Sequence, residues 1–97
     1  MISKFWQDQA EFVEIPSEIN GKQVTVIGPD AFSSCIYLSK ITFPDNLTTI
    51  CANAFNQCMS ISELNIPKTV TKIESGSFLD CHYLEKINIS KCKLSKI

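Results

Sequence analysis

The sequence lacks several features that define large classes of proteins. It contains no Arg, and nine Lys stand against ten Asp and Glu, which leaves a formal net charge of -1. Arg supplies the bidentate contacts to phosphate and guanine that nucleic-acid modules favour. Three Gly and four Pro are too few for a collagen-like chain, and 44% hydrophobic residues are too many for a disordered one. We expect a single folded domain over residues 1–97 and no nucleic-acid partner.

Long apolar runs and catalytic groups are scarce as well. No stretch approaches the roughly 18 apolar residues of a membrane span, and the N-terminal run lacks the apolar core of a signal peptide. The single His82 adjoins Asp80 and Cys81, but neighbours on one turn do not converge on a reacting centre. No Gly-rich phosphate loop or paired-carboxylate site occurs. The sequence predicts no membrane insertion, no enzyme and no cofactor.

The five cysteines are an odd set whose spacing fits neither a disulfide scaffold nor a zinc site with two close pairs. Cys35, Cys58 and Cys81 are evenly spaced, and we expect them to pack in the core as small hydrophobes. Cys51 and Cys92 leave this pattern and are expected to be more exposed. Reduced thiols and no metal site are the expectation, which favours a cytoplasmic location.

An internal repeat of 23 residues dominates what the sequence does contain. Three columns coincide without exception at this lag: Ile27, Ile50 and Ile73; Phe32, Phe55 and Phe78; and Cys35, Cys58 and Cys81. Three more stay apolar: Leu38, Ile61 and Leu84; Ile41, Leu64 and Ile87; and Phe43, Ile66 and Ile89. The copies cover approximately 38–60, 61–83 and a partial 84–97. A longer first copy, 10–37, places its surplus residues at the Asn-Gly turn signal of positions 20 and 21.

Two spacings alternate within each copy. Ile41 and Phe43 alternate with polar residues as in a half-buried strand, which the following proline ends because it lacks an N–H donor. Ala54, Phe55 and Cys58 lie three to four residues apart, which favours a short helical or 3₁₀ turn. Strands that recur in this way run parallel, and stacked copies bury an apolar strip that one copy could not. The predicted fold is an α/β solenoid, with a short parallel sheet on the concave side and short helical or 3₁₀ turns on the convex side.

Residues 14–35 resemble the repeat of the BspA-like, or Treponema-type, leucine-rich repeat family. That unit runs Leu, Ile, Ile-Pro, then Ile-Gly, then Ala-Phe and Cys over about 23 residues. Ile15-Pro16, Ile27-Gly28, Ala31-Phe32 and Cys35 stand at the corresponding places here, and the likeness extends over roughly residues 10–97. The resemblance implies a leucine-rich-repeat stack that binds proteins. It also implies kinship with adhesins and surface antigens, and hence a location at the cell surface.

Side chains that alternate away from the core form the candidate binding site, because the concave surface is the usual ligand face of repeat proteins. The candidate residues are Phe12, Glu14, Lys40, Thr42, Glu63, Asn65, Lys86 and Asn88. Phe12 is the large apolar anchor among them. The alternative is a solvated face, on which Lys40, Glu63 and Lys86 alternate in sign and support neighbouring strands.

The two ends of the chain carry separate expectations. Ile2, Phe5 and Trp6 are expected to fold over the first copy, as an N-terminal cap within residues 1–9. Ile97 ends the sequence where another turn would begin, without a cap. Two functions stay open at this point. One is a protein-recognition module with a protein ligand, and the other is a truncated or capping fragment of a longer array that self-associates through its C-terminal edge.

Overall fold

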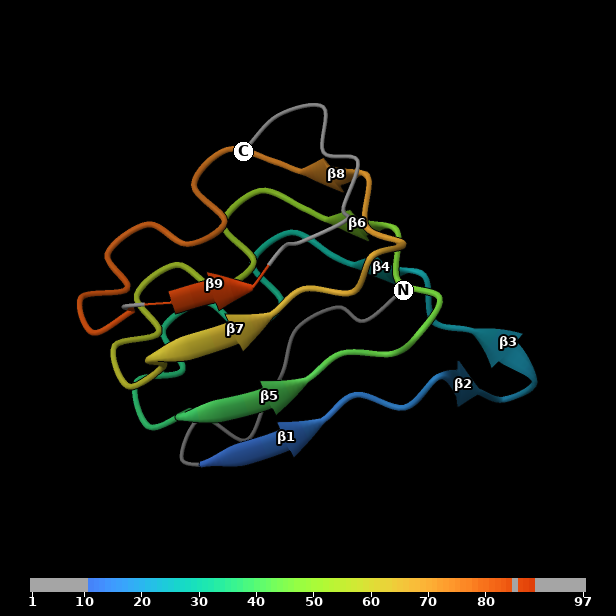
Figure 1. Ribbon diagram of the computed structural model, residues 1–97, viewed down its shortest axis with the longest axis horizontal. Coiled ribbons are helices and arrows are strands. Elements are labelled where there is room, and N and C mark those ends of the chain that lie inside the picture. Colours follow the sequence, from blue (N-terminus) through green and yellow to red (C-terminus); the bar gives the residue numbers. More distant parts are fainter. Residues whose placement is uncertain (1–10, 85, 89–97) are drawn as a thin grey trace.

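The computed structural model describes residues 11–84 and 86–88 as a stack of coils built from short strands (Figure 1). In chain order these are β1 (Phe12–Glu14), β2 (Glu18–Ile19), β3 (Lys22–Gln23), β4 (Val26–Ile27), β5 (Lys40–Thr42), β6 (Thr49–Ile50), β7 (Glu63–Asn65), β8 (Lys72–Ile73) and β9 (Lys86–Asn88). Apart from the β2–β3 hairpin, a three-residue strand and a two-residue strand alternate along the chain. This is the leucine-rich-repeat arrangement of short parallel strands that the 23-residue period predicts.

Equivalent strands of successive coils pair in parallel. β4, β6 and β8 form one three-stranded sheet, β1 pairs with β5, and β7 pairs with β9. The register joins Ile27 to Ile50 and Ile50 to Ile73, so the columns of the repeat are also columns in space. The surplus of the first coil forms the antiparallel hairpin of β2 and β3. Asn20 and Gly21 at its tip both have positive φ, as a tight hairpin turn requires.

The three-residue strands do not form a continuous sheet, in contrast to the expectation. β5 and β7 are neighbours in successive coils, but no hydrogen-bonded ladder joins them. Phe43 directly follows β5, at the position where the next coil has Ile66. The Phe43 ring packs edge-on against Phe55, with the ring centroids 5.9 Å apart. We call the surface formed by the outward side chains of β1, β5 and β7 the strand face, and the backbone pairing of β9 with β7 continues its strands.

The turns on the opposite side are not helical, and the described residues contain no helix. Residues 29–34, 52–57 and 75–80 are hydrogen-bonded turns instead. Each contains two residues with positive φ, a conformation that a right-handed helix excludes. These are Asp30 and Ser34, Asn53 and Gln57, and Gly76 and Asp80. Alternate N–H groups donate to the next coil, as Phe32 does to the carbonyl of Ala54 at 2.7 Å, so the turns stack as a ladder.

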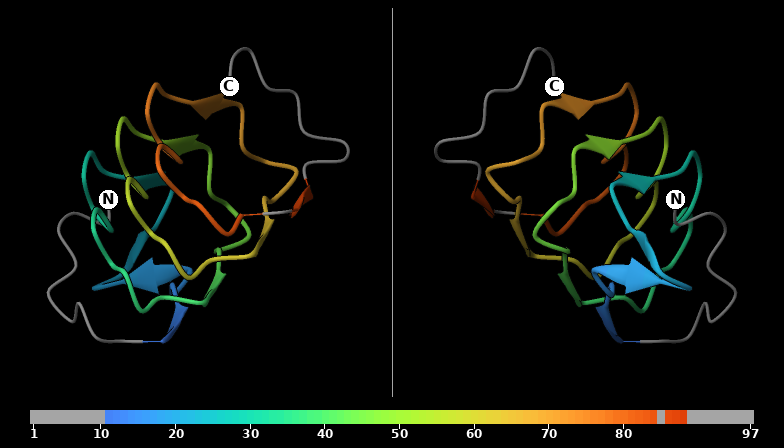
Figure 2. Two further views of the ribbon diagram at one scale, coloured as in Figure 1. Left: turned by 90° about the vertical axis from the view of Figure 1, so that its left-hand side faces the viewer. Right: turned by 90° about the vertical axis from the view of Figure 1, so that its right-hand side faces the viewer.

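Apolar side chains of successive coils share one core, around which the coils wrap in Figure 2. The rings of Phe32 and Phe55 are stacked with centroids 5.2 Å apart, and those of Phe55 and Phe78 with centroids 5.5 Å apart. Phe32 and Phe55 are buried, whereas Phe78 in the last described turn is half-buried. The predicted phenylalanine column is therefore confirmed.

Some expectations fall on residues that are not described. The N-terminal cap of Ile2, Phe5 and Trp6, the thiol of Cys92 and the C-terminal edge at Ile97 all lie outside the described residues. β9 is described through its backbone pairing with β7. Within the described residues, no helix has the length and apolar character needed to cross a membrane.

Candidate functional site

Six of the eight candidate binding residues lie together on the strand face. Phe12 and Glu14 of β1 stand beside Lys40 and Thr42 of β5, and Glu63 and Asn65 occupy the same positions in β7. All six side chains are exposed, while the residues between them face the core. Lys86 and Asn88 continue the two columns through their pairing with β7, but their side chains lie outside what the structure describes. A binding role for these residues stays a prediction.

Three hollows run along this face and meet at Thr42. The interstrand hollow, of about 570 Å³, lies between β5 and β7 and is lined by residues of 39–45 and 62–67. The end hollow, of about 500 Å³, lies where the chain leaves β1 and β5 and is lined by residues 14–17 and 42–45. The anchor hollow, of about 350 Å³, lies over β1 and β5 and includes Phe12.

The interstrand hollow follows from the missing ladder. The N–H of Lys40 donates to the carbonyl of Glu11 at 3.1 Å, and the carbonyl of Thr42 accepts from the N–H of Ile15 at 3.0 Å. Backbone groups of alternate residues face opposite sides of a strand, so those of Ile41 face β7. Some Cα atoms of β5 lie within 8 Å of Cα atoms of β7. A strand inserted between them would need about 4.8 Å on each side, so these two strands are too close together to admit one. The hollow therefore has no room for an added strand between β5 and β7.

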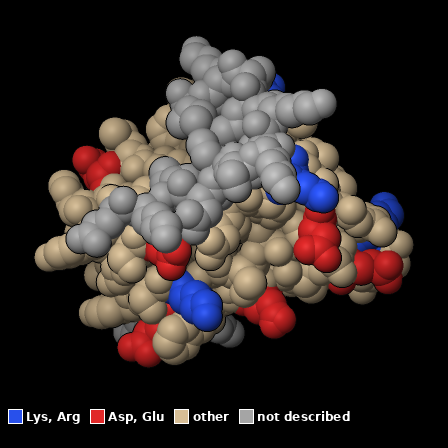
Figure 3. All heavy atoms as spheres, viewed as in Figure 1, with Lys and Arg blue, Asp and Glu red and all other residues tan. Residues whose placement is uncertain are grey.

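Negative charge prevails among the described side chains that line the three hollows. Glu14, Asp45 and Glu63 contribute carboxylates, whereas Lys40 contributes the cation. In Figure 3, acidic side chains flank a basic one in the lower part of the view, where β1 and β5 lie. Sequence reasoning missed Asp45 because it follows the strand and falls outside the alternation used to select residues. Its position directly after Pro44, where the chain turns at the rim of the sheet, was the available signal.

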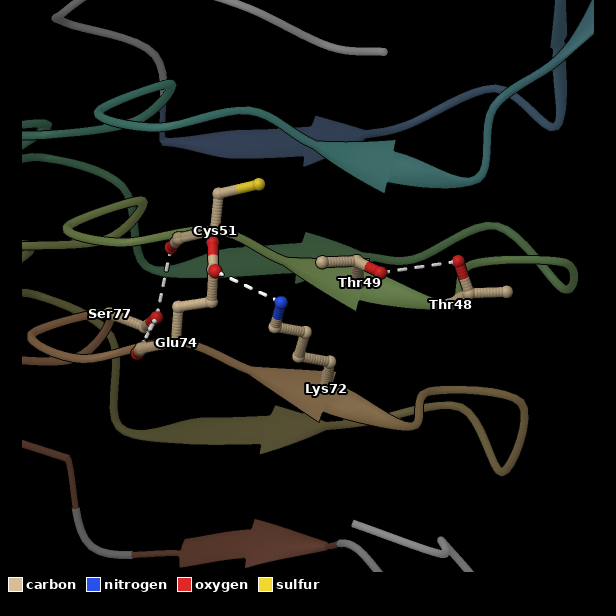
Figure 4. Close-up of polar contacts among 6 residues, drawn as sticks. All are labelled: Thr48, Thr49, Cys51, Lys72, Glu74 and Ser77. Atoms are coloured by element: carbon tan, nitrogen blue, oxygen red, sulfur yellow. Dashed lines mark hydrogen bonds and ion pairs between the residues drawn. The ribbon is translucent and has the colours of Figure 1, made fainter. Parts of the chain in front are cut away.

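A second polar cluster lies on the β4–β6–β8 sheet, away from the strand face (Figure 4). Lys72 Nζ and Glu74 Oε2 are 3.3 Å apart, and the Ser77 hydroxyl donates to the carbonyl of Cys51 at 2.9 Å. The hydrogen bond from Lys72 lowers the pKa of Glu74. Burial and the hydrogen bond to Glu74 raise the pKa of Cys51, so its thiol is a poor nucleophile. This cluster therefore ties neighbouring coils together and shows no catalytic arrangement.

The cysteine column packs inside the turns, as predicted for core thiols. The thiol of Cys58 donates to the carbonyl of Phe32 at 3.0 Å, and that of Cys81 donates to Phe55 at 3.1 Å. A hydrogen bond to Cys35 raises the pKa of Cys58, and burial raises the pKa of Cys81. None of the four described cysteines forms a disulfide. In the described part of the chain, no three His, Cys, Asp or Glu side chains are placed to hold a metal ion.

Comparison with known proteins agrees with this architecture. The family profile described as the BspA type leucine rich repeat region, in six copies, matches residues 3–97. Among solved structures, the crystal structure of a leucine-rich repeat protein of T. pallidum (TpLRR) is similar, with 21% sequence identity and a TM-score of 0.50. The match covers 88% of this chain and 61% of that chain, so the present chain spans less than two thirds of its length. No curated protein matches the sequence. Since the profile covers nearly the whole chain, this chain belongs to the BspA-type leucine-rich repeat family.

Proposed function

We propose that the chain is a non-enzymatic protein-interaction module that binds its partner through the strand face. The observation that carries this proposal is the run of three hollows that meet at Thr42 and are lined by six exposed strand residues. Strands held by a shared core present such residues on a rigid surface, which lowers the entropy lost on binding. Membership of a leucine-rich repeat family supports the same role, because stacked repeats characteristically offer extended binding surfaces.

Phe12 is the apolar anchor of the proposed interface. Its side chain is 70% exposed in the chain alone. Large aromatic side chains contribute most to binding energy when a partner buries them at the centre of an interface. Lys40 and Glu14 line the same hollow as Phe12 and supply polar contacts around it. Burial of this ring by a partner would therefore account for an aromatic side chain that the fold itself leaves in water.

A role among adhesins or surface antigens is the finer form of the proposal. The BspA-type repeat supports it, and the strand face supplies the surface that such a protein needs. Limited proteolysis of intact cells that express the chain, followed by immunoblotting, tests it. Surface display predicts loss of the chain without cell lysis, and full protection of the chain would contradict the adhesin role while leaving protein recognition intact.

A pair of matched variants tests recognition through the strand face. We expect Phe12→Ser combined with Lys40→Glu to weaken binding of an affinity-captured partner at least about tenfold, since loss of a central anchor typically costs about 2 kcal/mol or more and about 1.4 kcal/mol corresponds to a tenfold change. The control combines Ile19→Ser with Lys22→Glu, which makes the same kinds of change at exposed positions of the β2–β3 hairpin. Affinity is measured by biolayer interferometry. Equal binding by wild type and the strand-face variant would refute the proposed site.

A further inference from the structure

The end hollow combines apolar walls with two carboxylates. Four of its lining residues are apolar, namely Ile15, Pro16, Phe43 and Pro44. Glu14 and Asp45 line the same hollow and are exposed, and Ser17 and Thr42 complete it. The parallel register of β1 and β5 brings these segments side by side, since Glu14 pairs with Thr42 and the prolines follow at equivalent positions.

Neither carboxylate has a counter-ion in the described part of the chain. The salt bridge found there joins Lys72 to Glu74, on the other sheet. Lys40 lines the two neighbouring hollows but not this one. Both carboxylates line this one hollow, so a cation placed in it is attracted by two negative charges. The two prolines also lack N–H groups, so their backbone offers no donor to occupy the carboxylates.

We propose that the end hollow takes one cationic side chain, arginine or lysine, from the protein partner; this rests on the proposed function of the strand face. Both side chains carry an apolar stem that packs on apolar surface and a charged head that stays with polar groups. The stem fits the walls formed by Ile15, Phe43 and the prolines, and the head meets the carboxylates of Glu14 and Asp45.

The site belongs to the first two coils, because the following coil changes its charge. Lys68 occupies the position of Asp45 one repeat later, and Asn65 occupies that of Thr42. One coil later, a cationic side chain would meet Lys68 beside Asp45 in place of two carboxylates. The end hollow therefore favours one register of a partner along the strand face, since a shift by one coil removes the paired negative charge.

An NMR titration with blocked amino acids tests the chemistry directly. The probes are Nα-acetyl-arginine methylamide, Nα-acetyl-lysine methylamide and the neutral isostere Nα-acetyl-citrulline methylamide. We expect saturable amide shifts at Glu14, Ser17 and Asp45 with the arginine or the lysine probe, at millimolar concentration, and none with citrulline. The absence of saturable shifts with both cationic probes would overturn the inference. Equal shifts with citrulline would overturn it as well.

Charge-neutralising variants provide the matched control. Glu14→Gln with Asp45→Asn should raise the dissociation constant of the cationic probe at least about tenfold. Glu18→Gln with Asp30→Asn removes the same net charge outside the end hollow and should leave the dissociation constant unchanged. This control should fold normally, because Asn tolerates the positive φ of Asp30. Equal weakening of probe binding in both variants would show that only the net charge of the protein matters, and would refute the end hollow as a cation site.

This outcome is separable from that of the proposed function. The variants that test the proposed function change Phe12 and Lys40, neither of which lines the end hollow. Loss of the partner in those variants without binding of the cationic probes would leave the strand face as a binding site and refute the end hollow as a cation site.

Discussion

Phe55 is the residue on which the core depends most. Its ring contacts Phe32 and Phe78 on either side and Phe43 edge-on, and it is completely buried. Each stacked or edge-on ring pair adds about 0.5–1.5 kcal/mol beyond the area it buries. The side chain thus links three successive coils, none of which could bury its own apolar surface alone.

Phe55→Ala is expected to abolish the cooperative thermal transition or nearly so. Truncation of a buried Phe costs about 3–5 kcal/mol, compared with a total stability of roughly 5–15 kcal/mol for a small domain. Circular dichroism melting measures the effect. Phe12→Ala serves as the control, because this ring is exposed and should melt close to wild type. A Phe55→Ala melt within a few degrees of wild type would contradict the shared core.

At the scale of elements, the turns 29–34, 52–57 and 75–80 determine how the coils stack. Their left-handed positions recur in phase, with Asp30, Asn53 and Gly76 in one column. Asn and Asp tolerate this conformation better than most residues, and Gly adopts it without strain. The apolar spacing of Ala54, Phe55 and Cys58 predicted a helical turn, but the same inward contacts arise in a turn whose N–H groups bond to the next coil. Local spacing could not distinguish the two because both bury the same side chains.

Gly76→Ala should destabilise the chain more than Gly21→Ala. Both glycines have positive φ, so both variants incur a backbone cost of about 1 kcal/mol. A Cβ at Gly76 would also collide with Oδ1 of Asn53 in the adjacent turn, whereas one at Gly21 would meet open space. Urea unfolding compares the two variants. A larger loss of stability in Gly21→Ala would show that the stacked turns are not tightly packed at Asn53.

At the scale of the whole molecule, the strand face and the β4–β6–β8 sheet differ in the continuity of their hydrogen bonding. The β4–β6–β8 sheet is a continuous ladder, which holds the coils in register through backbone hydrogen bonds. The strand face is interrupted between β5 and β7, and its hollows form the proposed surface for recognition. The candidate site thus lies where the ladder between coils is broken.

Light scattering distinguishes recognition from self-association for the chain as a whole. A recognition module that acts through the strand face should remain a monomer of 10.9 kDa across a wide range of concentration. A fragment that docks through its C-terminal edge would instead show a mass that rises with concentration. A rising mass would favour the structural alternative and weaken the proposed function.

The repeat period by itself determined the stack, the phenylalanine and cysteine columns and the six exposed residues of the strand face. Alternation along a strand and the in-phase return of apolar residues are local properties, so they can be read without knowing how the coils meet. The tertiary structure decided the break between β5 and β7, the left-handed turns and the end hollow of Glu14 and Asp45. These depend on how segments of different coils meet, and such packing between distant segments is not encoded in any one repeat.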